Sequence, residues 1–264
     1  MSTNTYALRD SATMLRRNLR HMQRYPSMTL MLVGLPIVFL LLFVFVFGGT
    51  LGAGLPGAVS GGRAEYLEYV TPGILLVTVI GAATNTAVSV AMDMTEGIIA
   101  RFRTMAIARV SVLTGHVVGS LIQTMLGIAL VLGVAVLLGF RPTAGLLEWL
   151  AVFGVLAMAS FAVIWLSVAL GMVTNSVETA SNLPMPLMLL PFLGSGFVPT
   201  DSLPTALRWF AEYQPFTPIN ETVRGLLVGT PIGNSAALAV AWCAVIALGG
   251  YLWAKKLYNR DPSS

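Results

Sequence analysis

The sequence predicts an all-α integral membrane protein with six transmembrane helices, an N-terminal amphipathic interfacial helix and a re-entrant helical segment before the last span. Of its 264 residues, 56% are hydrophobic and only 10% are charged. A soluble domain carries about 25% charged residues, so this chain has too few charges to cover a water-exposed surface. Its long apolar runs are separated by connectors that hold most of the charge. Residues 1–264 are therefore predicted to form a single transmembrane domain.

Residues 6–25 are predicted to form a helix that lies on the membrane surface. Apolar side chains recur on one helical stripe from Leu8 to Met22, and arginines lie beside and opposite it. A basic amphipathic helix of this kind lies in the headgroup plane with its apolar face toward lipid. The alternative is a cytosolic helix packed on a partner, but a membrane span follows within a few residues. The arginines of this interfacial helix include Arg16, Arg17 and Arg20.

Six apolar runs are assigned as membrane spans, because about 20 residues of helix cross roughly 30 Å of hydrocarbon. The first run is longer than the apolar core of a signal peptide, which is about 7–15 residues, so it is predicted to be a retained span. A glycine-rich loop is expected at 48–62, and three prolines interrupt the fifth span. The predicted spans are 28–47, 71–92, 117–138, 149–173, 182–198 and 235–253.

The distribution of basic residues predicts the orientation. With the N-terminus inside, the inner segments carry 11 of the 15 lysines and arginines. Cytoplasmic loops carry an excess of Lys and Arg, so both termini are expected in the cytoplasm and the protein in the plasma (inner) membrane. The outer segments hold the remaining four, which are Arg63, Arg141, Arg208 and Arg224.

The connector 93–109, which follows the second predicted span, concentrates charge in a chain with little of it. It holds Asp93, Glu96, Arg101, Arg103 and Arg109 within 17 residues. In the predicted orientation this connector lies in the cytoplasm. A short charged helix there suits a soluble partner, whereas the alternative is a set of arginines that reach up to lipid headgroups.

Several kinds of chemistry are excluded by the residues that are missing. A P-loop needs a lysine for the β- and γ-phosphates, and Lys255 and Lys256 at the C-terminal end are the only lysines. His21 and His116 are too far apart to indicate a metal or catalytic cluster, and Cys243 is the only cysteine. Each Asp and Glu falls in a predicted loop or at a span edge, which argues against an ion-coupled carrier. No catalytic site, metal site or bound cofactor is therefore expected in this chain.

Weakly polar residues recur along faces of the second and third spans. Faces of this kind let helices approach closely and form hydrogen bonds with one another. The alternative is a substrate path of neutral groups, which suits a large amphipathic substrate better than an ion. An amide in mid-span is costly without a partner, which makes Asn85 and Gln123 the positions to test. The candidate path residues are Thr78, Asn85, Ser89, Ser120 and Gln123.

The segment 199–234 mixes aromatic, charged and proline residues and is too long for a tight turn. We expect two short helices that dip into the outer leaflet and return, forming an outer gate. Irregular backbone at membrane depth is tolerated where protein or water covers it. The alternative is a folded loop on the membrane surface. The candidate gate residues are Phe197, Pro199, Trp209, Phe210 and Phe216.

Two strings carry a resemblance to a known family. DMTEGIIARFRTMAIARVSVLTG follows the second span, and SGFVPTDSLPTALRWFAEYQPFTPINETVRGLL precedes the last span. They resemble the corresponding stretches of type-2 ABC exporter permeases, in the daunorubicin/doxorubicin-resistance permease subfamily. The six-span plan, the cytoplasmic termini and the N-terminal helix agree with that family, so the resemblance covers nearly the whole chain.

The resemblance implies a permease subunit of an ATP-driven exporter of hydrophobic drug-like or lipid substrates. Such a permease forms a dimer, expected here to be a homodimer among membrane lipids, and binds two copies of a separate ABC ATP-binding subunit that holds ATP and Mg²⁺. No nucleic acid partner is expected. In that family the short helix after the second span docks into a groove of the ATPase. By position this role falls on Met94, Thr95, Glu96, Gly97, Ile98, Arg101, Phe102 and Arg103.

Two other functions stay open at this point. Within the same class, the chain could export a lipid-linked glycan or a polyketide lipid. In a different class, it could be a stand-alone secondary carrier that responds to an ion gradient. The family's motifs indicate how the permease couples to the ATPase, and they do not identify the compound that is transported.

Overall fold

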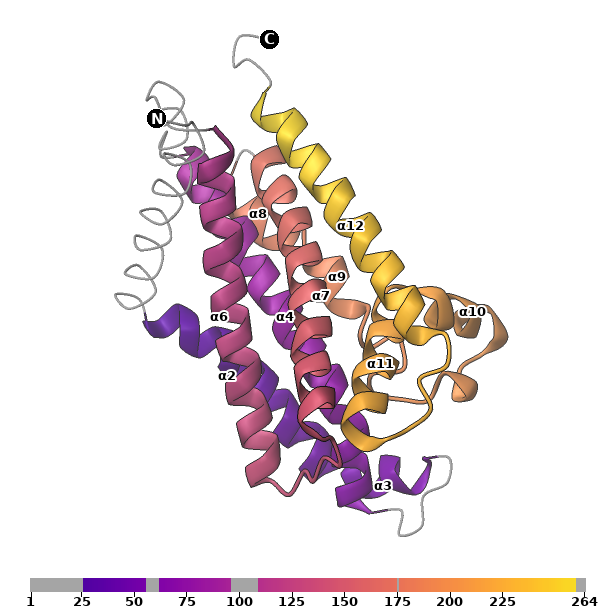
Figure 1. The fold of residues 1–264 in the computed structure, drawn as a ribbon. Helices are drawn as coiled ribbons and strands as arrows, with labels where there is room; N and C mark the ends of the chain where they lie inside the picture. The colour runs from indigo at the N-terminus through magenta and orange to yellow at the C-terminus, as the bar shows by residue number, and fades with distance from the viewer. Residues whose placement is uncertain (1–25, 56–61, 96–108, 175, 260–264) are drawn as a thin grey trace.

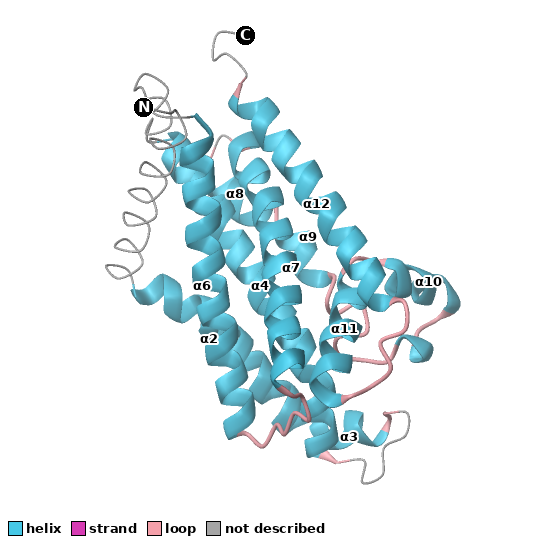
Figure 2. Cartoon of the chain, viewed as in Figure 1, coloured by secondary structure: helices cyan, strands magenta, loops and turns pink. Residues whose placement is uncertain are grey.

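The computed structural model describes residues 26–55, 62–95, 109–174 and 176–259, and these residues form a bundle of helices without strands (Figures 1 and 2). Within these ranges five helical stretches are long and apolar enough to cross a membrane, which makes the chain a multi-pass membrane protein. They are Leu32–Ala53, Arg63–Thr95, Thr114–Leu137, Leu146–Val173 and Ser235–Tyr258.

Helix α4 (Arg63–Thr95) forms the core of the bundle. It packs against α2 (Pro26–Leu42), α6 (Arg109–Leu137) and α7 (Leu146–Val173). In its most apolar stretch 72% of the residues are buried, whereas in the corresponding stretch of α12 (Ser235–Tyr258) only 17% are buried. Because lipid tails are as apolar as leucine, exposed apolar side chains are expected where a helix faces the bilayer. Helix α4 is therefore in contact with protein on most sides, and α12 faces outward.

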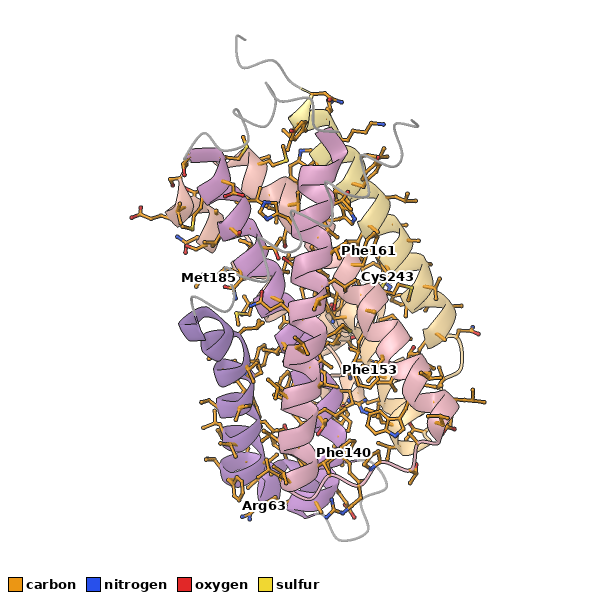
Figure 3. All side chains as sticks on the ribbon, turned by 60° about the vertical axis from the view of Figure 1, so that its left-hand side comes forward. Arg63, Phe140, Phe153, Phe161, Met185 and Cys243 are labelled. Carbon is orange, nitrogen blue, oxygen red and sulfur yellow. The ribbon has the colours of Figure 1, made fainter. Side chains whose placement is uncertain are left out.

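The ends of the helices define the two ends of the bundle. Arg63, at the start of α4, and Phe140, just after α6, lie toward the same end (Figure 3). Helices α4 and α6 run in opposite directions, so Thr95 and Arg109 are at the other end of the bundle, near the C-terminal end of α12 (Figure 1).

A glycine allows α7 to lie closely against α4. A Cβ atom added at Gly171 would lie 2.5 Å from the carbonyl oxygen of Ala87 in α4, so only glycine fits at this contact. Ser160 and Ser167 of α7 are fully buried. Small residues permit this close approach of helices.

The first span differs from its prediction at its C-terminal side. A π-helical turn, η1 (Phe43–Phe47), follows α2, and a further helix, α3 (Gly48–Ala53), occupies the start of the predicted loop. The hydroxyl of Thr50 donates to the carbonyl oxygen of Phe47 at 3.0 Å. Glycine disfavours a helix in water, but in an apolar environment the backbone groups must be satisfied internally, which favours continued helix.

The predicted fifth span, 182–198, is interrupted, as its three prolines indicated, and it forms no long apolar helix. The chain forms two short helices, α8 (Val177–Asn182) and α9 (Met185–Leu189), and then turns through Val198. Pro184, Pro186 and Pro191 lack a backbone N–H and clash with the preceding turn of a helix. The described chain therefore has five long apolar helices rather than six.

The segment before α12 contains two helices, as the sequence predicted. A 3₁₀ turn, η2 (Thr200–Ser202), leads into α10 (Thr205–Tyr213), and α11 (Phe216–Val228) follows. Helix α11 is largely buried and packs against α4, α7 and α12. Helix α10 is exposed and lies to the outside of α11 (Figure 1). The two helices thus differ sharply in burial.

Candidate transport and coupling sites

The predicted path residues occupy different environments on α4 and α6. Thr78 is fully buried, and its hydroxyl donates to the carbonyl oxygen of Ile74 in the same helix at 3.0 Å. Asn85 is exposed, whereas Ser89 and Gln123 are half-buried. The polar face of α4 is therefore packed near Thr78 and reaches the surface from Asn85 toward the end of the helix. Of the five candidate path residues, Thr78 is buried, Asn85 is exposed, and Ser89, Ser120 and Gln123 are half-buried.

The fifth path residue, Ser120, belongs to the contact between α4 and α6. The hydroxyl of Thr86 donates to the hydroxyl oxygen of Ser120 at 2.9 Å and also lies 2.9 Å from the carbonyl oxygen of Ala82. Ser120 therefore joins two helices, as expected for the packing interpretation of this face.

A second polar contact joins α4 and α6 closer to their connection. His116 Nε2 lies 2.9 Å from Asp93 Oδ2, and each side chain is only 11% exposed. An ionised carboxylate only accepts hydrogen bonds, so the imidazole Nε2 is the donor. Sequence reasoning placed Asp93 at a span edge and treated His116 as an isolated polar residue. The signal that could have paired them is their position, since each lies about one to two turns from the connection of two antiparallel helices.

Only the first two of the predicted coupling residues lie in the described chain. Met94 is half-buried, and Thr95 is exposed at the end of α4, where its hydroxyl donates to the carbonyl oxygen of Met92 at 3.0 Å. The other coupling residues and the arginines of the N-terminal helix lie outside the described residues. These are Glu96, Gly97, Ile98, Arg101, Phe102, Arg103, Arg16, Arg17 and Arg20.

The irregular backbone between Pro191 and Val198 lies directly on α4. A Cβ atom added at Gly73 would lie 2.5 Å from the carbonyl oxygen of Gly196, so the two backbones touch. The hydroxyl of Tyr66 donates to the carbonyl oxygen of Phe197 at 3.1 Å. These contacts attach the end of the broken helix to the most buried part of α4.

Side chains of α11 and of the turn before it satisfy carbonyl groups of the same irregular backbone. Asn220 Nδ2 donates to the carbonyl oxygen of Ser195 at 3.0 Å, and Gln214 Nε2 donates to that of Leu190 at 3.0 Å. Unwound backbone is tolerated at membrane depth only when such partners replace the lost helical hydrogen bonds. Sequence reasoning missed these residues because their partners are 24 and 25 positions away.

Arg224 joins three elements at this site. Its Nη2 donates to the carbonyl oxygens of Ser195, at 2.5 Å, and of Tyr69 in α4, at 3.1 Å. Its guanidinium carbon lies 3.8 Å from the centre of the Tyr69 ring, within the range of a cation–π contact. Arg224 therefore holds α11, the irregular segment and α4 together through one side chain.

The predicted gate residues fall into two groups. Phe197 and Phe216 are buried, and Phe197 stacks on Phe192 with ring centres 4.3 Å apart. Trp209 is 69% exposed and Phe210 is 41% exposed, both on α10, and Pro199 is half-buried. The structure therefore brings Phe197 and Phe216 into the core and leaves the two α10 aromatic residues on the surface.

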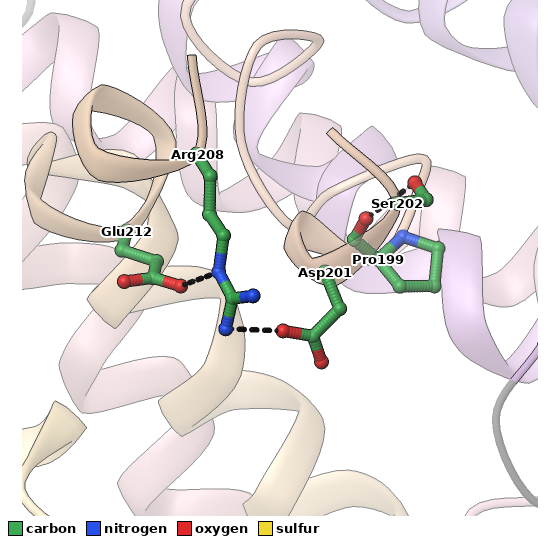
Figure 4. A network of polar contacts seen from close by, with 5 residues as sticks. All are labelled: Pro199, Asp201, Ser202, Arg208 and Glu212. Carbon is green, nitrogen blue, oxygen red and sulfur yellow. Dashed lines mark hydrogen bonds and ion pairs between the residues drawn. The ribbon is translucent and has the colours of Figure 1, made fainter. Parts of the chain in front are cut away.

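An exposed ion-pair network holds the start of α10 to the 3₁₀ turn (Figure 4). Arg208 Nε donates to Glu212 Oε1 at 2.7 Å, and its Nη2 lies 2.5 Å from Asp201 Oδ1. The hydrogen bond with Glu212 and the charge of Asp201 both raise the pKa of the Arg208 guanidinium. The arginine therefore stays charged and compensated at the protein surface.

Nothing in the described ranges forms a group of three or more His, Cys, Asp or Glu side chains that could hold a metal ion. The chemistry available at the sites above is hydrogen bonding, packing and charge pairing.

A bundle of long apolar helices, with a broken helix joined to a buried α11, is a membrane domain rather than a soluble one. The family model described as "ABC-2 type transporter" matches residues 10–228. The chain therefore belongs to the ABC-2 type transporter family. It is the membrane permease component of an ABC transporter, which works with an ABC ATP-binding partner.

Three curated relatives are similar along most of the chain. The "Daunorubicin resistance ABC transporter permease protein DrrB1" of Streptomyces coeruleorubidus is 28% identical over 226 residues, which is 85% of this chain and 77% of the relative. The "Probable doxorubicin resistance ABC transporter permease protein DrrC" from two strains of Mycobacterium tuberculosis is 25% identical over 253 residues. That match covers 94% of this chain and 88% of each relative. The resemblance drawn from the two strings is confirmed.

Proposed function

We propose that this chain is the permease subunit of an ATP-driven exporter that moves hydrophobic, drug-like compounds out of the cell. The observation that carries this proposal is the family match over residues 10–228, together with relatives named for daunorubicin and doxorubicin resistance. Asn85 and Ser89 of α4 and Gln123 of α6 are neutral polar side chains that are exposed or half-buried on long apolar helices. Such side chains suit an amphipathic organic compound better than an ion.

The proposed topology has six membrane crossings, with α8, α9 and the turns to Val198 forming a broken fifth crossing. Both termini and the connection between α4 and α6 then lie in the cytoplasm of a cell whose plasma membrane holds the protein. The excess of basic residues in the inner segments, 11 of 15, supports this orientation. In it, α10 and α11 lie at the outer leaflet as re-entrant helices.

The proposed assembly is a homodimer of this permease with two copies of an ATP-binding subunit that binds ATP and Mg²⁺. Residues 94–103 dock into the ATPase, where Glu96 and the arginines pair with charged groups and Phe102 fills a pocket. The N-terminal helix, 6–25, lies at the inner membrane surface beside the ATPase. ATP binding draws the two coupling segments together, and the movement opens the outer region.

The proposed outer gate consists of the irregular segment, α10 and α11. Phe197 and Phe216 are buried in the core beneath this segment, whereas Trp209 and Phe210 are exposed. Aromatic residues concentrate at membrane–water interfaces, which suits the exposed face of α10. Opening requires the segment to move relative to α4, which it touches at Gly73.

The coupling role predicts that ATPase binding depends on the arginines of the connection. Replacing both Arg101 and Arg103 with Glu should reduce the amount of ATP-binding subunit that co-purifies by at least about tenfold, because each change reverses one charge at the interface. Co-purification from membranes in mild detergent, quantified by mass spectrometry, measures this. The matched control is Lys255→Glu with Lys256→Glu, the same number of charge reversals at the exposed end of α12. Equal recovery of the ATPase with both double variants would contradict the assigned coupling segment.

The path role predicts that Asn85 and Gln123 affect substrate selection. Asn85→Leu and Gln123→Leu should change the relative transport of a polar and an apolar compound by about threefold, or roughly 0.7 kcal/mol, while assembly is retained. The control is Asn234→Leu, which removes an exposed amide at the start of α12. Transport is compared for a panel of fluorescent compounds in vesicles. Unchanged ratios for both path variants would assign these residues to helix packing alone.

A further inference from the structure

Asp93 and His116 form a polar contact between α4 and α6 close to their connection. Among the contacts between these antiparallel helices, three follow one another along their length. Gly127 of α6 lies against Thr78 of α4, Thr86 bonds to Ser120, and Asp93 pairs with His116. The first two contacts are neutral, and the third involves two ionisable side chains. The connection, 96–108, is only 13 residues long and begins three residues after Asp93.

This pair is unusual for its position in a membrane protein. Both side chains are 11% exposed and both belong to helices long enough to span the bilayer. Ionisable residues within spanning helices are rare, face the interior and mark functional positions. A neutral hydroxyl pair such as Thr86 with Ser120 already joins the two helices. A hydrogen bond between Asp93 and His116 is stronger than a neutral one when either group is charged, and it joins the helices close to their ends.

Helix α4 also extends to the proposed outer gate. Tyr66 donates to the carbonyl oxygen of Phe197, the carbonyl oxygen of Tyr69 accepts from Arg224, and Gly73 touches Gly196. One continuous helix, Arg63–Thr95, therefore carries the Asp93–His116 pair at one end and the contacts with the gate at the other.

We propose that the Asp93–His116 pair is a clamp that locks the ends of α4 and α6 together, so that displacement of the connection by the ATPase moves both helices as one body and reaches the outer gate through α4. The inference rests on the proposed function and assigns positioning roles to two residues that neither the coupling segment nor the substrate path includes. Without the clamp the two helix ends separate, and movement of the connection is absorbed locally. ATP hydrolysis then continues with less transport.

The first test measures compound transported per ATP hydrolysed, using the permease with its ATP-binding subunit in proteoliposomes. His116→Leu removes the donor, whereas His116→Gln keeps an N–H near the position of Nε2. We expect normal co-purification of the ATPase for both variants, a loss of at least about fivefold in transport per ATP for His116→Leu, and retention of most transport for His116→Gln. Thr84→Val is the control, since the Thr84 hydroxyl bonds within its own helix, to the carbonyl oxygen of Ile80.

The outcomes separate the clamp from the proposed function. If the unmodified complex does not transport with ATP, the proposed function fails. If the unmodified complex transports and His116→Leu transports equally well per ATP, the clamp is overturned while the function stands. Equal losses in His116→Leu and His116→Gln would also overturn it, because a retained hydrogen bond should preserve the clamp.

A second test needs no change to the pair. Spin labels at Val88, which is half-buried on α4, and at Val118, which is exposed on α6, are introduced after Cys243 is replaced by Ser. The clamp requires that the separation of the labels is the same in the resting complex and in the complex trapped with ATP and vanadate. A separation that widens or splits on trapping would overturn the proposal, even if the His116 variants cannot be purified.

Discussion

Arg224→Leu is expected to destabilise the protein strongly and to abolish transport. Hydrogen bonds to a charged group contribute about 1.5–3 kcal/mol each, so the loss of two should lower the free energy of unfolding by about 3 kcal/mol. The bonds in question join Arg224 to the carbonyl oxygens of Ser195 and Tyr69. Unfolding by SDS in mixed micelles measures the change. Arg224→Lys keeps the positive charge but replaces the planar guanidinium with an ammonium group, so an intermediate loss of stability is expected.

A matched control for this prediction lies 16 residues earlier in the chain. Arg208 pairs with Asp201 and Glu212, but all three side chains are at the surface. Solvent screens exposed pairs of this kind, so Arg208→Leu should leave the unfolding transition almost unchanged. Comparable destabilisation by the two substitutions would show that Arg224 does not hold the irregular segment in place.

Gly73→Ala is expected to have the second large effect. The added Cβ would lie 2.5 Å from the carbonyl oxygen of Gly196 and 2.9 Å from two further backbone atoms, which cannot rotate away as a side chain would. Forced overpacking costs typically 1–3 kcal/mol, and we expect a loss of about 3 kcal/mol in the same unfolding assay. The irregular segment should also become more accessible to protease from the outer side.

Gly154→Ala is the control for this steric argument. Gly154 lies within α7, and a Cβ atom there meets nothing within 4 Å. Alanine favours a helix over glycine by up to about 1 kcal/mol, so this variant should be as stable as the parent or slightly more stable. If Gly73→Ala were equally harmless, the close contact between α4 and the irregular segment would not exist in the membrane.

Much of the bundle could be predicted because membrane spans have a simple signature. A charge-free run of about 20 residues is sufficient to identify a span, and five of the runs correspond to long apolar helical stretches, which are Leu32–Ala53, α4, α6, α7 and α12. The residues at which the helices begin and end were less predictable. Helix α4 begins at Arg63 rather than near Thr71, because Tyr66 and Leu67 are buried and belong to the core.

The prolines indicated that the fifth span is broken, but the partners of its unwound backbone could not be predicted in the same way. Composition identified 182–198 as apolar, but its three prolines prevented a continuous helix, and its free carbonyl groups found partners in Asn220, Gln214 and Arg224. Such contacts connect positions far apart in the sequence. The pairing of Asp93 with His116 was equally hidden, because each residue alone is ordinary at the edge of a span.

The most direct measurement of the central claim is ATP-driven transport in inverted membrane vesicles that contain the permease with its ATP-binding subunit. The account predicts that a fluorescent anthracycline accumulates inside the vesicles with ATP and Mg²⁺, that a non-hydrolysable ATP analogue does not support this accumulation, and that a proton uncoupler leaves it intact. Accumulation that needs no ATP and collapses with the uncoupler would contradict the account and identify a secondary carrier.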